Sequence, residues 1–124
     1  MTRIIYLNLV FVLILSISVQ AQPIRSVPYH MMLETAEASL EKFDYYNAIE
    51  WFEKCYKESR DKDIAVKIAE LHYQLRDFKR ASGWYKRLLA RDRDKLYSEQ
   101  RFMYGKTLKM MGDYQGAIDQ FLIS

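Results

Sequence analysis

A nine-residue phrase that occurs three times constrains the fold of this sequence more than any other feature. Each copy reads Asp, an aromatic residue, two variable residues, Ala, three variable residues and a second aromatic residue. The copies begin at Asp44, Asp77 and Asp113, so they lie 33 and 36 residues apart. A period near 34 residues is typical of stacked pairs of helices. The phrase therefore predicts an all-α solenoid, and it directs the functional question towards binding rather than catalysis.

Small residues recur upstream of the phrase in the same phase. A small residue lies twelve positions before the Ala of each phrase, and a packing residue follows three positions later. The phrase alanines are Ala48, Ala81 and Ala117, the upstream small residues are Ala36, Ala69 and Gly105, and the packing residues are Ser39, His72 and Leu108. Because small side chains let two helices approach closely, we predict that the small residues lie where paired helices cross.

The whole pattern resembles the tetratricopeptide repeat, and the resemblance covers residues 29–124. It implies a right-handed solenoid of helical hairpins with about three repeats, near 29–61, 62–97 and 98–124, of which the last is truncated. The 3–4 spacing of apolar residues places six helices near 29–42, 45–59, 63–75, 78–91, 95–111 and 114–124. The repeated rings are expected to pack in the core rather than to stack bases, and they are Tyr45, Phe52, Phe78, Tyr85, Tyr114 and Phe121.

Two charged turns separate the repeats, at residues 60–63 and 91–94. We expect Asp63 and Asp94 to cap the helices that follow, because an Asp side chain accepts hydrogen bonds from the first free amides of a helix. A mixed-charge docking strip and a divalent-metal loop remain alternatives for these turns. The interleaved Lys and Arg residues disfavour the metal loop, which needs converging oxygen ligands.

Residues 1–21 have the composition of an export signal. Arg3 precedes an apolar stretch of 16 residues from Ile4 to Val19, and Ala21 ends a cleavage-like Val-Gln-Ala. A helix that spans a bilayer needs about 20 residues, so we expect a cleaved signal peptide rather than a membrane anchor. A linker over 22–28 would follow. The mature chain would then be exported, periplasmic or associated with the outer membrane, and not membrane-spanning.

The last repeat stops in the middle of its second helix, with residues 121–123 near an open end. Solenoids normally end in a polar capping helix. We therefore expect either that the chain is a piece of a longer protein or that another surface covers this end.

The export signal, the short Gln-Pro linker and the Asp-Tyr-x-x-Ala repeats are together similar to a narrower family. In these outer-membrane-associated proteins of the Bacteroidetes type, tetratricopeptide repeats precede a β-propeller and an OmpA-like peptidoglycan-binding domain, and some act in type IX secretion and gliding. No residue of this chain matches the propeller or peptidoglycan motifs, so those activities are not carried over.

No group of residues has the spacing of a catalytic or metal site. His30 and His72 lie a full repeat apart and have no Cys or carboxylate at ligand spacing. Cys55 is the single cysteine, and its place in the repeat favours a buried structural thiol. Without the signal peptide the chain has 18 Lys and Arg (19 less Arg3) against 16 Asp and Glu, a balance that disfavours a nucleic-acid surface. We expect no enzyme activity, no cofactor and no metal.

A binding surface follows from the resemblance, because the first helix of each tetratricopeptide pair lines a groove that holds a peptide or a partner helix. The groove-facing positions, repeat by repeat, are His30, Leu33, Glu37, Leu40 and Glu41, then Asp63, Val66, Glu70, Tyr73 and Gln74, then Glu99, Phe102, Lys106, Lys109 and Met110. The set is acidic in its first half, basic at its end and apolar throughout, and it lacks the Lys/Asn/Arg clamp for a terminal carboxylate. We expect a helix or an extended protein segment on apolar anchors, with the charges setting its direction. The alternative is a structural stalk or self-association segment without a ligand groove, in which the face around Phe121 packs on a second copy or a downstream domain.

Overall fold

The computed structural model describes residues 26–124, so the expected signal peptide over 1–21 and most of the linker over 22–28 lie outside the described residues. The described part contains six α-helices and no strand, as the repeat predicts. The helices are α2 (Tyr29–Glu41), α3 (Tyr45–Ser59), α4 (Lys62–Gln74), α5 (Phe78–Leu89), α6 (Ser98–Met110) and α7 (Tyr114–Ile123). Apart from the start of α6, the helix ends lie within one or two residues of the positions expected from the sequence.

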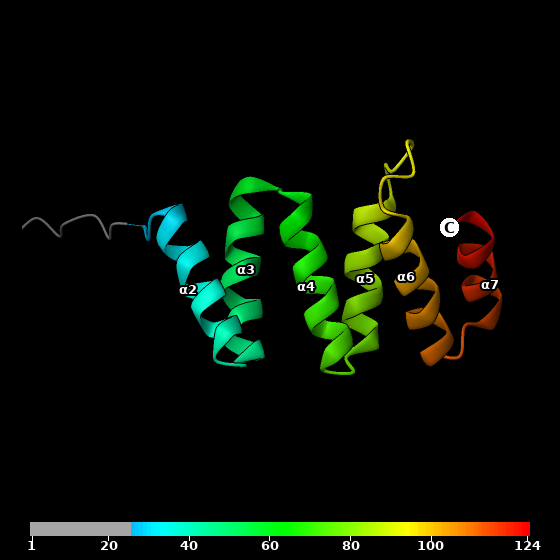
Figure 1. Ribbon diagram of the computed structural model, residues 1–124, viewed down its shortest axis with the longest axis horizontal. Helices are drawn as coiled ribbons and strands as arrows, with labels where there is room; N and C mark the ends of the chain where they lie inside the picture. The colour runs from blue at the N-terminus through cyan, green and yellow to red at the C-terminus, as the bar shows by residue number, and fades with distance from the viewer. Residues whose placement is uncertain (1–25) are drawn as a thin grey trace, which may run out of the picture.

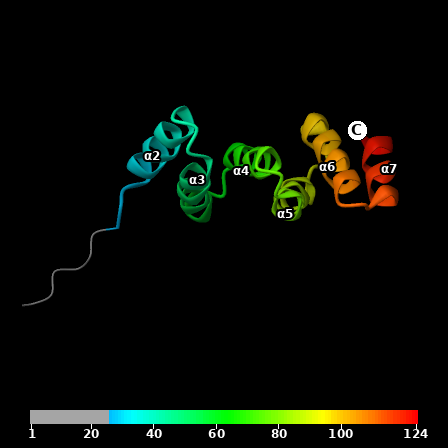
Figure 2. The same ribbon diagram turned by 90° about the horizontal axis from the view of Figure 1, so that it is seen from below.

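The helices form three consecutive hairpins in a single row (Figure 1). The most extensive packing is between helices that follow one another in the chain, from α2 with α3 through to α6 with α7. Seen from below, α2, α4 and α6 lie along one side of the row, and α3 and α5 lie along the other (Figure 2). First and second helices of the pairs therefore present two separate surfaces.

The turn inside each hairpin has the same geometry in all three repeats. The residue before the phrase Asp is in the left-handed region, with φ of 59° at Phe43, 60° at Arg76 and 84° at Gly112. The amides of Asp44, Asp77 and Asp113 each donate at 2.9 Å to a carbonyl five residues earlier, on Ser39, His72 and Leu108. The phrase Asp then caps the next helix, because its side chain accepts from the amide three residues later, on Asn47, Arg80 and Gly116. The recurring Asp is thus explained by its role as an N-cap.

The cap expected at Asp63 is wrong. Arg60 ends α3 in the left-handed region, with φ of 56°, and the chain then turns so that α4 begins one residue earlier than expected. Asp61 is therefore the N-cap, and its side chain accepts from the amide of Asp63 at 2.9 Å.

The cap expected at Asp94 is also wrong. The residue before α6 is Tyr97, and no side chain caps that end of the helix. The three extra residues of the second interval lie in the loop between α5 and α6, where Lys95 has a φ of 52°. Asp92 holds this loop, because its carboxylate accepts from the amide of Leu96 at 2.9 Å.

The core follows the small residues that the sequence singled out. Ala36, Ala48, Ala69 and Ala81 have no exposed surface and Ala117 has 3%. The packing positions Ser39, His72 and Leu108 are buried as well. A larger cluster fills the space among α2, α3 and α4, and its members are Met32, Ala36, Ala48, Ile49, Phe52, Cys55, Ile64, Ile68 and Leu71. A smaller cluster of Ala69, Ala81 and Tyr85 joins α4 to α5.

The expectation that every repeated ring packs in the core is only partly correct. Phe52 and Tyr85 are fully buried, whereas Tyr114 is 66% exposed. Within the described residues α7 is the last helix, and it leaves Tyr114 largely exposed. Cys55 is fully buried as predicted, and burial followed by the nearby Glu58 carboxylate raises the pKa of its thiol. A buried thiol that resists ionisation is a structural residue.

Candidate binding surface

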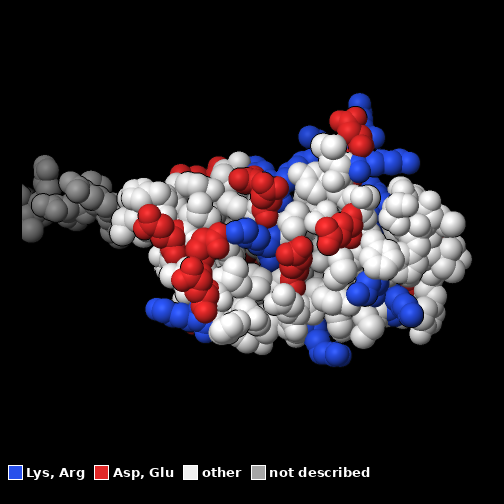
Figure 3. Space-filling view, viewed as in Figure 1, with Lys and Arg blue, Asp and Glu red and all other residues white. Residues whose placement is uncertain are grey.

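The side chains expected to bind a partner occupy one surface, formed by α2, α4 and α6. We call it the first-helix face, and its expected binding residues are Leu33, Glu37, Leu40, Glu41, Val66, Glu70, Tyr73, Gln74, Phe102, Lys106, Lys109 and Met110. None of these side chains is fully buried. In Figure 3, acidic groups spread over α2, α4 and the start of α6 with a basic group among them, and further basic groups lie over the other end of α6. The surface is therefore accessible and has two zones of opposite charge.

A hollow of about 250 Å³ lies between the end of α2 and the middle of α4. Of the expected residues, it brings together Leu40, Glu70 and Gln74. Phe43 and Tyr45 also line it, and sequence reasoning missed both. Phe43 is 77% exposed and its ring lies edge-on to Tyr45 at 6.3 Å. The sequence offers one indication for Phe43. This large apolar residue stands at the turn position that Gly112 holds in the third repeat, and the turn itself does not require a ring there.

Lys67 is the second residue that sequence reasoning missed. Its ammonium group pairs with the Glu37 carboxylate across α2 and α4 and lies 5.3 Å from the centre of the Phe52 ring. Both charged side chains are about two-fifths exposed, at 41% and 42%, so this pair contributes only about 0–1 kcal/mol to stability. Glu37 therefore already has an ion-pair partner and is not a free carboxylate on this surface.

Glu70 and Glu99 form the acidic centre of the first-helix face. Partial burial raises the pKa of Glu70, the Glu99 carboxylate on α6 raises it further, and Lys67 opposes both effects. No ion pair within residues 26–124 neutralises either carboxylate. Two like charges at close range disfavour each other, so a cationic group placed between them would be stabilised.

Tyr73, Phe102 and Lys106 form an aromatic cluster beside these acids. The Lys106 ammonium lies 5.7 Å from the centre of the Tyr73 ring and 6.0 Å from that of Phe102. Phe102 is 49% exposed and contacts Phe121 at 5.3 Å between ring centres. Exposed rings in a fixed position supply contact area at low entropic cost, which is why aromatic residues are enriched at the centres of interfaces.

The remaining expected residues differ in how available they are. Leu33 and Leu40 partly pack against the larger core cluster, and Tyr73 partly packs against the smaller one. Val66 is half-buried on α4, whereas Glu41, Lys109 and Met110 are exposed at the ends of their helices. His30 and Asp63 are exposed near the starts of α2 and α4. The structure thus groups the middle of the set and leaves its ends apart.

His72 lies away from this face, in the core beside α3 and α5. Its Nε2 has no hydrogen-bond partner, and the Glu53 carboxylate lies 3.8 Å from it. Burial lowers the pKa of His72, while Asp77 and Glu53 raise it. The described residues contain no group of three side chains suited to hold a metal ion. Nor does any helix within 26–124 have the length and apolar character needed to cross a bilayer.

Comparison with known proteins agrees with this architecture. Residues 41–122 match the family model described as anaphase-promoting complex, cyclosome, subunit 3. The chain is also similar to the crystal structure of MamA, with a TM-score of 0.63 and 15% sequence identity, over 75% of this chain and 54% of that chain. The chain therefore spans about half of the MamA chain, and at this identity the likeness concerns the fold alone. A search of the curated proteins found no match.

These matches and the helical hairpins confirm a solenoid of the tetratricopeptide type. They give no support to the narrower resemblance to exported OmpA-like or type IX secretion proteins, which stays a prediction.

Proposed function

The chain belongs to the family described as anaphase-promoting complex, cyclosome, subunit 3, and we propose that it is a scaffold that binds a segment of a partner protein on its first-helix face. Solenoids of this type present extended binding surfaces rather than catalytic pockets. One observation carries the assignment to this face. The exposed Phe102 ring, the Tyr73 ring and Lys106 lie together, next to the two carboxylates of Glu70 and Glu99.

The partner segment is a helix or an extended strand with matching chemistry. An apolar side chain contacts Phe102 and Tyr73, a basic side chain lies between Glu70 and Glu99, and an acidic side chain meets Lys106. Alternating apolar and charged contacts of this kind hold a helix or peptide in one direction.

The test is covalent capture of the partner in the cells that make the protein. Chemical crosslinking followed by affinity purification and mass spectrometry compares the unmodified chain with Tyr73→Ala and Phe102→Ala combined. The matched control combines Tyr46→Ala and Tyr114→Ala, which removes two rings that are 76% and 66% exposed on α3 and α7. We expect the first pair alone to reduce capture, with helical circular dichroism unchanged in both. Unchanged capture by the first pair places the binding surface elsewhere.

The scaffold is further proposed to act outside the cytoplasm, in the periplasm or at the outer membrane. The support is the composition of residues 1–21, with Arg3, an apolar stretch and a small-residue cleavage motif. Amino-terminal sequencing of the protein from fractionated cells tests this. A mature chain that begins at Gln22 in an envelope fraction is the expected result, and an intact Met1 in the cytoplasmic fraction contradicts it.

A second candidate function is self-association through the third hairpin. The outer side of α7 exposes Ile118 at 49%, Leu122 at 81% and Ile123 at 44%, a concentration of apolar side chains that is unusual on a free surface. Size-exclusion chromatography with light scattering on residues 22–124 decides between the two. Self-association is favoured if the measured mass rises with protein concentration and if the Leu122→Lys variant has the mass of a monomer. A monomer mass that does not depend on concentration disfavours it.

A further inference from the structure

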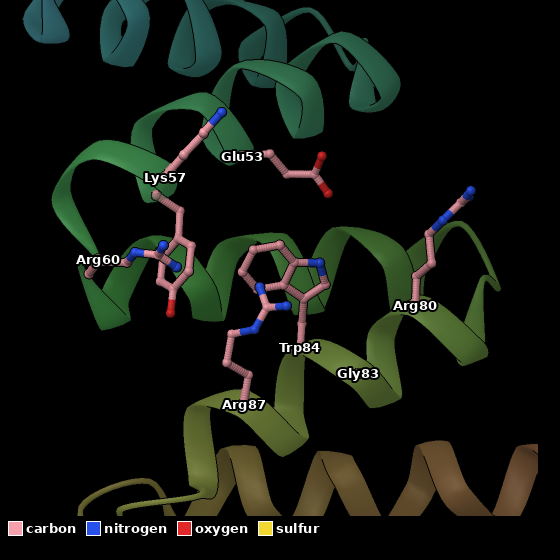
Figure 4. A pocket seen from close by; sticks show the side chains of 8 residues that line it. Glu53, Lys57, Arg60, Arg80, Gly83, Trp84 and Arg87 are labelled. Atoms are coloured by element: carbon pink, nitrogen blue, oxygen red, sulfur yellow. The ribbon is translucent and has the colours of Figure 1, made fainter.

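A second hollow lies between α3 and α5 (Figure 4). These two helices lie on the side of the row opposite α2, α4 and α6 (Figure 2). Its volume is about 460 Å³. The residues that define its chemistry are four cations and two rings, namely Lys57, Arg60, Arg80, Arg87, Tyr56 and Trp84. Sequence reasoning missed this site, because its residues come from the second helices of two different repeats.

The two rings hold two of the guanidinium groups in place. The Trp84 indole meets the Tyr56 ring at 81° with 5.0 Å between their centres. The Arg87 guanidinium lies 4.5 Å from the centre of the indole ring, and that of Arg60 lies 5.5 Å from the centre of Tyr56. Figure 4 shows Trp84 and Arg87 reaching from α5 towards α3. A guanidinium that stacks by its face keeps its edge N–H groups free to bind a carboxylate with two hydrogen bonds.

The positive charge of this hollow is poorly neutralised by the chain itself. Arg80 pairs with Asp77 at 2.8 Å. Lys57, Arg60 and Arg87 form no ion pair within residues 26–124. Glu53 is the single carboxylate that lines the hollow, against four cations. Cations that are held in a concave site and are not paired attract an anionic ligand.

We propose that this hollow binds an acidic peptide segment of a partner protein. Carboxylates of the segment accept hydrogen bonds from Arg60 and Arg87, and an apolar side chain between them packs on Tyr56 and Trp84. This site goes beyond the proposed function, because it uses α3 and α5 and leaves the first-helix face free. The scaffold would then join two partners, one on each side of the row.

A nucleic acid fits the same hollow less well. Single strands bind by stacking their bases on open aromatic faces, whereas the Trp84 indole already carries the Arg87 guanidinium on its face. The Glu53 carboxylate would also lie close to a phosphate backbone. A carboxylate-bearing peptide needs neither an open ring face nor a continuous basic track.

The experiment measures binding of a fluorescein-labelled peptide of repeating Glu-Glu-Leu units to the full chain, with a Lys-Lys-Leu peptide and a labelled oligo(dT) as comparison probes. We expect Arg60→Gln combined with Arg87→Gln to lower the affinity for the acidic peptide at least about tenfold, which is the effect of losing one charge-assisted hydrogen bond. The matched control is Arg91→Gln combined with Arg93→Gln, two exposed cations in the loop after α5, which removes the same charge. It should leave the affinity unchanged.

A second measurement needs no variant. Trp51 and Trp84 are the two tryptophans, and the acidic peptide should shift the indole N–H resonance of Trp84 and not that of Trp51. An unshifted Trp84 in the presence of the peptide overturns the proposal. Equal loss of affinity for the acidic peptide in both double variants also overturns it, because that result indicates unspecific charge attraction. Tighter binding of oligo(dT) than of the acidic peptide overturns it as well, because that result indicates a nucleic-acid site.

Discussion

The Phe121 ring lies over Gly105, and a Cβ at that glycine would lie 2.5 Å from Cε1 and 2.8 Å from Cδ1 of the ring. Gly105 is buried in α6 at the position that Ala36 and Ala69 hold in the first two repeats. The absence of a side chain at Gly105 is therefore what gives the Phe121 ring its place.

We predict that Gly105→Ala destabilises the protein. The added methyl gains helix propensity, worth about 0.5–1 kcal/mol, but it displaces the Phe121 ring, and overpacking costs typically about 1–3 kcal/mol. Thermal unfolding followed by circular dichroism measures the difference. Phe121→Ala should make the same substitution at Gly105 harmless, because the ring that obstructs the methyl is then absent.

Gly83 provides the matched control within the same chain. It lies inside α5, and a Cβ built there meets no atom within 4 Å. Gly83→Ala should therefore stabilise the protein by about 0.5–1 kcal/mol. If Gly83→Ala and Gly105→Ala shift the unfolding temperature in the same direction, the packing of Phe121 on Gly105 is not as described.

Arg76→Gly should stabilise the protein through the turn between α4 and α5. Arg76 has a φ of 60°, in the left-handed region that costs a side-chain-bearing residue about 1–2 kcal/mol. Glycine is free of this cost but loses more entropy on folding, so we expect a net gain of about 0.5–1 kcal/mol in denaturant unfolding. The reciprocal change is Gly112→Ala at φ 84°, where a Cβ meets no atom within 4 Å. It should destabilise by a similar amount, and a stabilised Gly112→Ala would contradict the argument.

The sequence predicted the hairpins well because the contacts that define them are local and repeated. Ala48 and Ala81 are fully buried between paired helices, so the spacing of these small residues indicates where the helices cross. The start of α6 could not be found in this way. The longer interval between copies indicates that three residues were added. It does not indicate that they lie in the loop that Asp92 holds and in which Lys95 has a positive φ.

The candidate sites were predictable only in part, and for a related reason. The core fixes the rotation of each helix, so residues such as Glu70 and Phe102 lie on the expected face. The Lys67–Glu37 pair and the hollow beside Phe43 depend on how α2 and α4 sit against each other, which no single helix encodes. The hollow around Trp84 depends likewise on the distance between α3 and α5.

Asp77→Ala should cost about 0.5–2 kcal/mol of stability, as the loss of an N-cap does. The Asp77 carboxylate accepts from the amide of Arg80 at 3.2 Å and from its guanidinium at 2.8 Å. Asp94→Ala is the matched control, because Asp94 is exposed in the loop before α6 and caps no helix. Equal losses of unfolding free energy in the two variants would show that the repeated Asp is not a cap.

The stability of the protein should fall in mild acid because of His72. Its pKa is lowered in the folded state by burial, against the opposing effect of Asp77 and Glu53. The unfolded chain then binds the proton more readily, so the free energy of unfolding rises with pH in this range. The contribution is fully present above the unfolded pKa of about 6.5 and decreases as the pH falls from there towards the lower folded value.

His72→Leu isolates this effect, because Leu108 holds the same position in the third repeat. The substitution removes the buried, unpartnered Nε2 and leaves every carboxylate in place. Denaturant unfolding of both proteins at about pH 7 and about pH 5 gives the difference. We expect the original chain to lose more stability between these values than the variant does. The raised pKa of Glu70 makes the free energy of unfolding fall with rising pH, the opposite of the His72 effect. This contribution is the same in both proteins and cancels in the comparison. Equal losses in the two proteins would mean that His72 takes up its proton as easily in the core as in water.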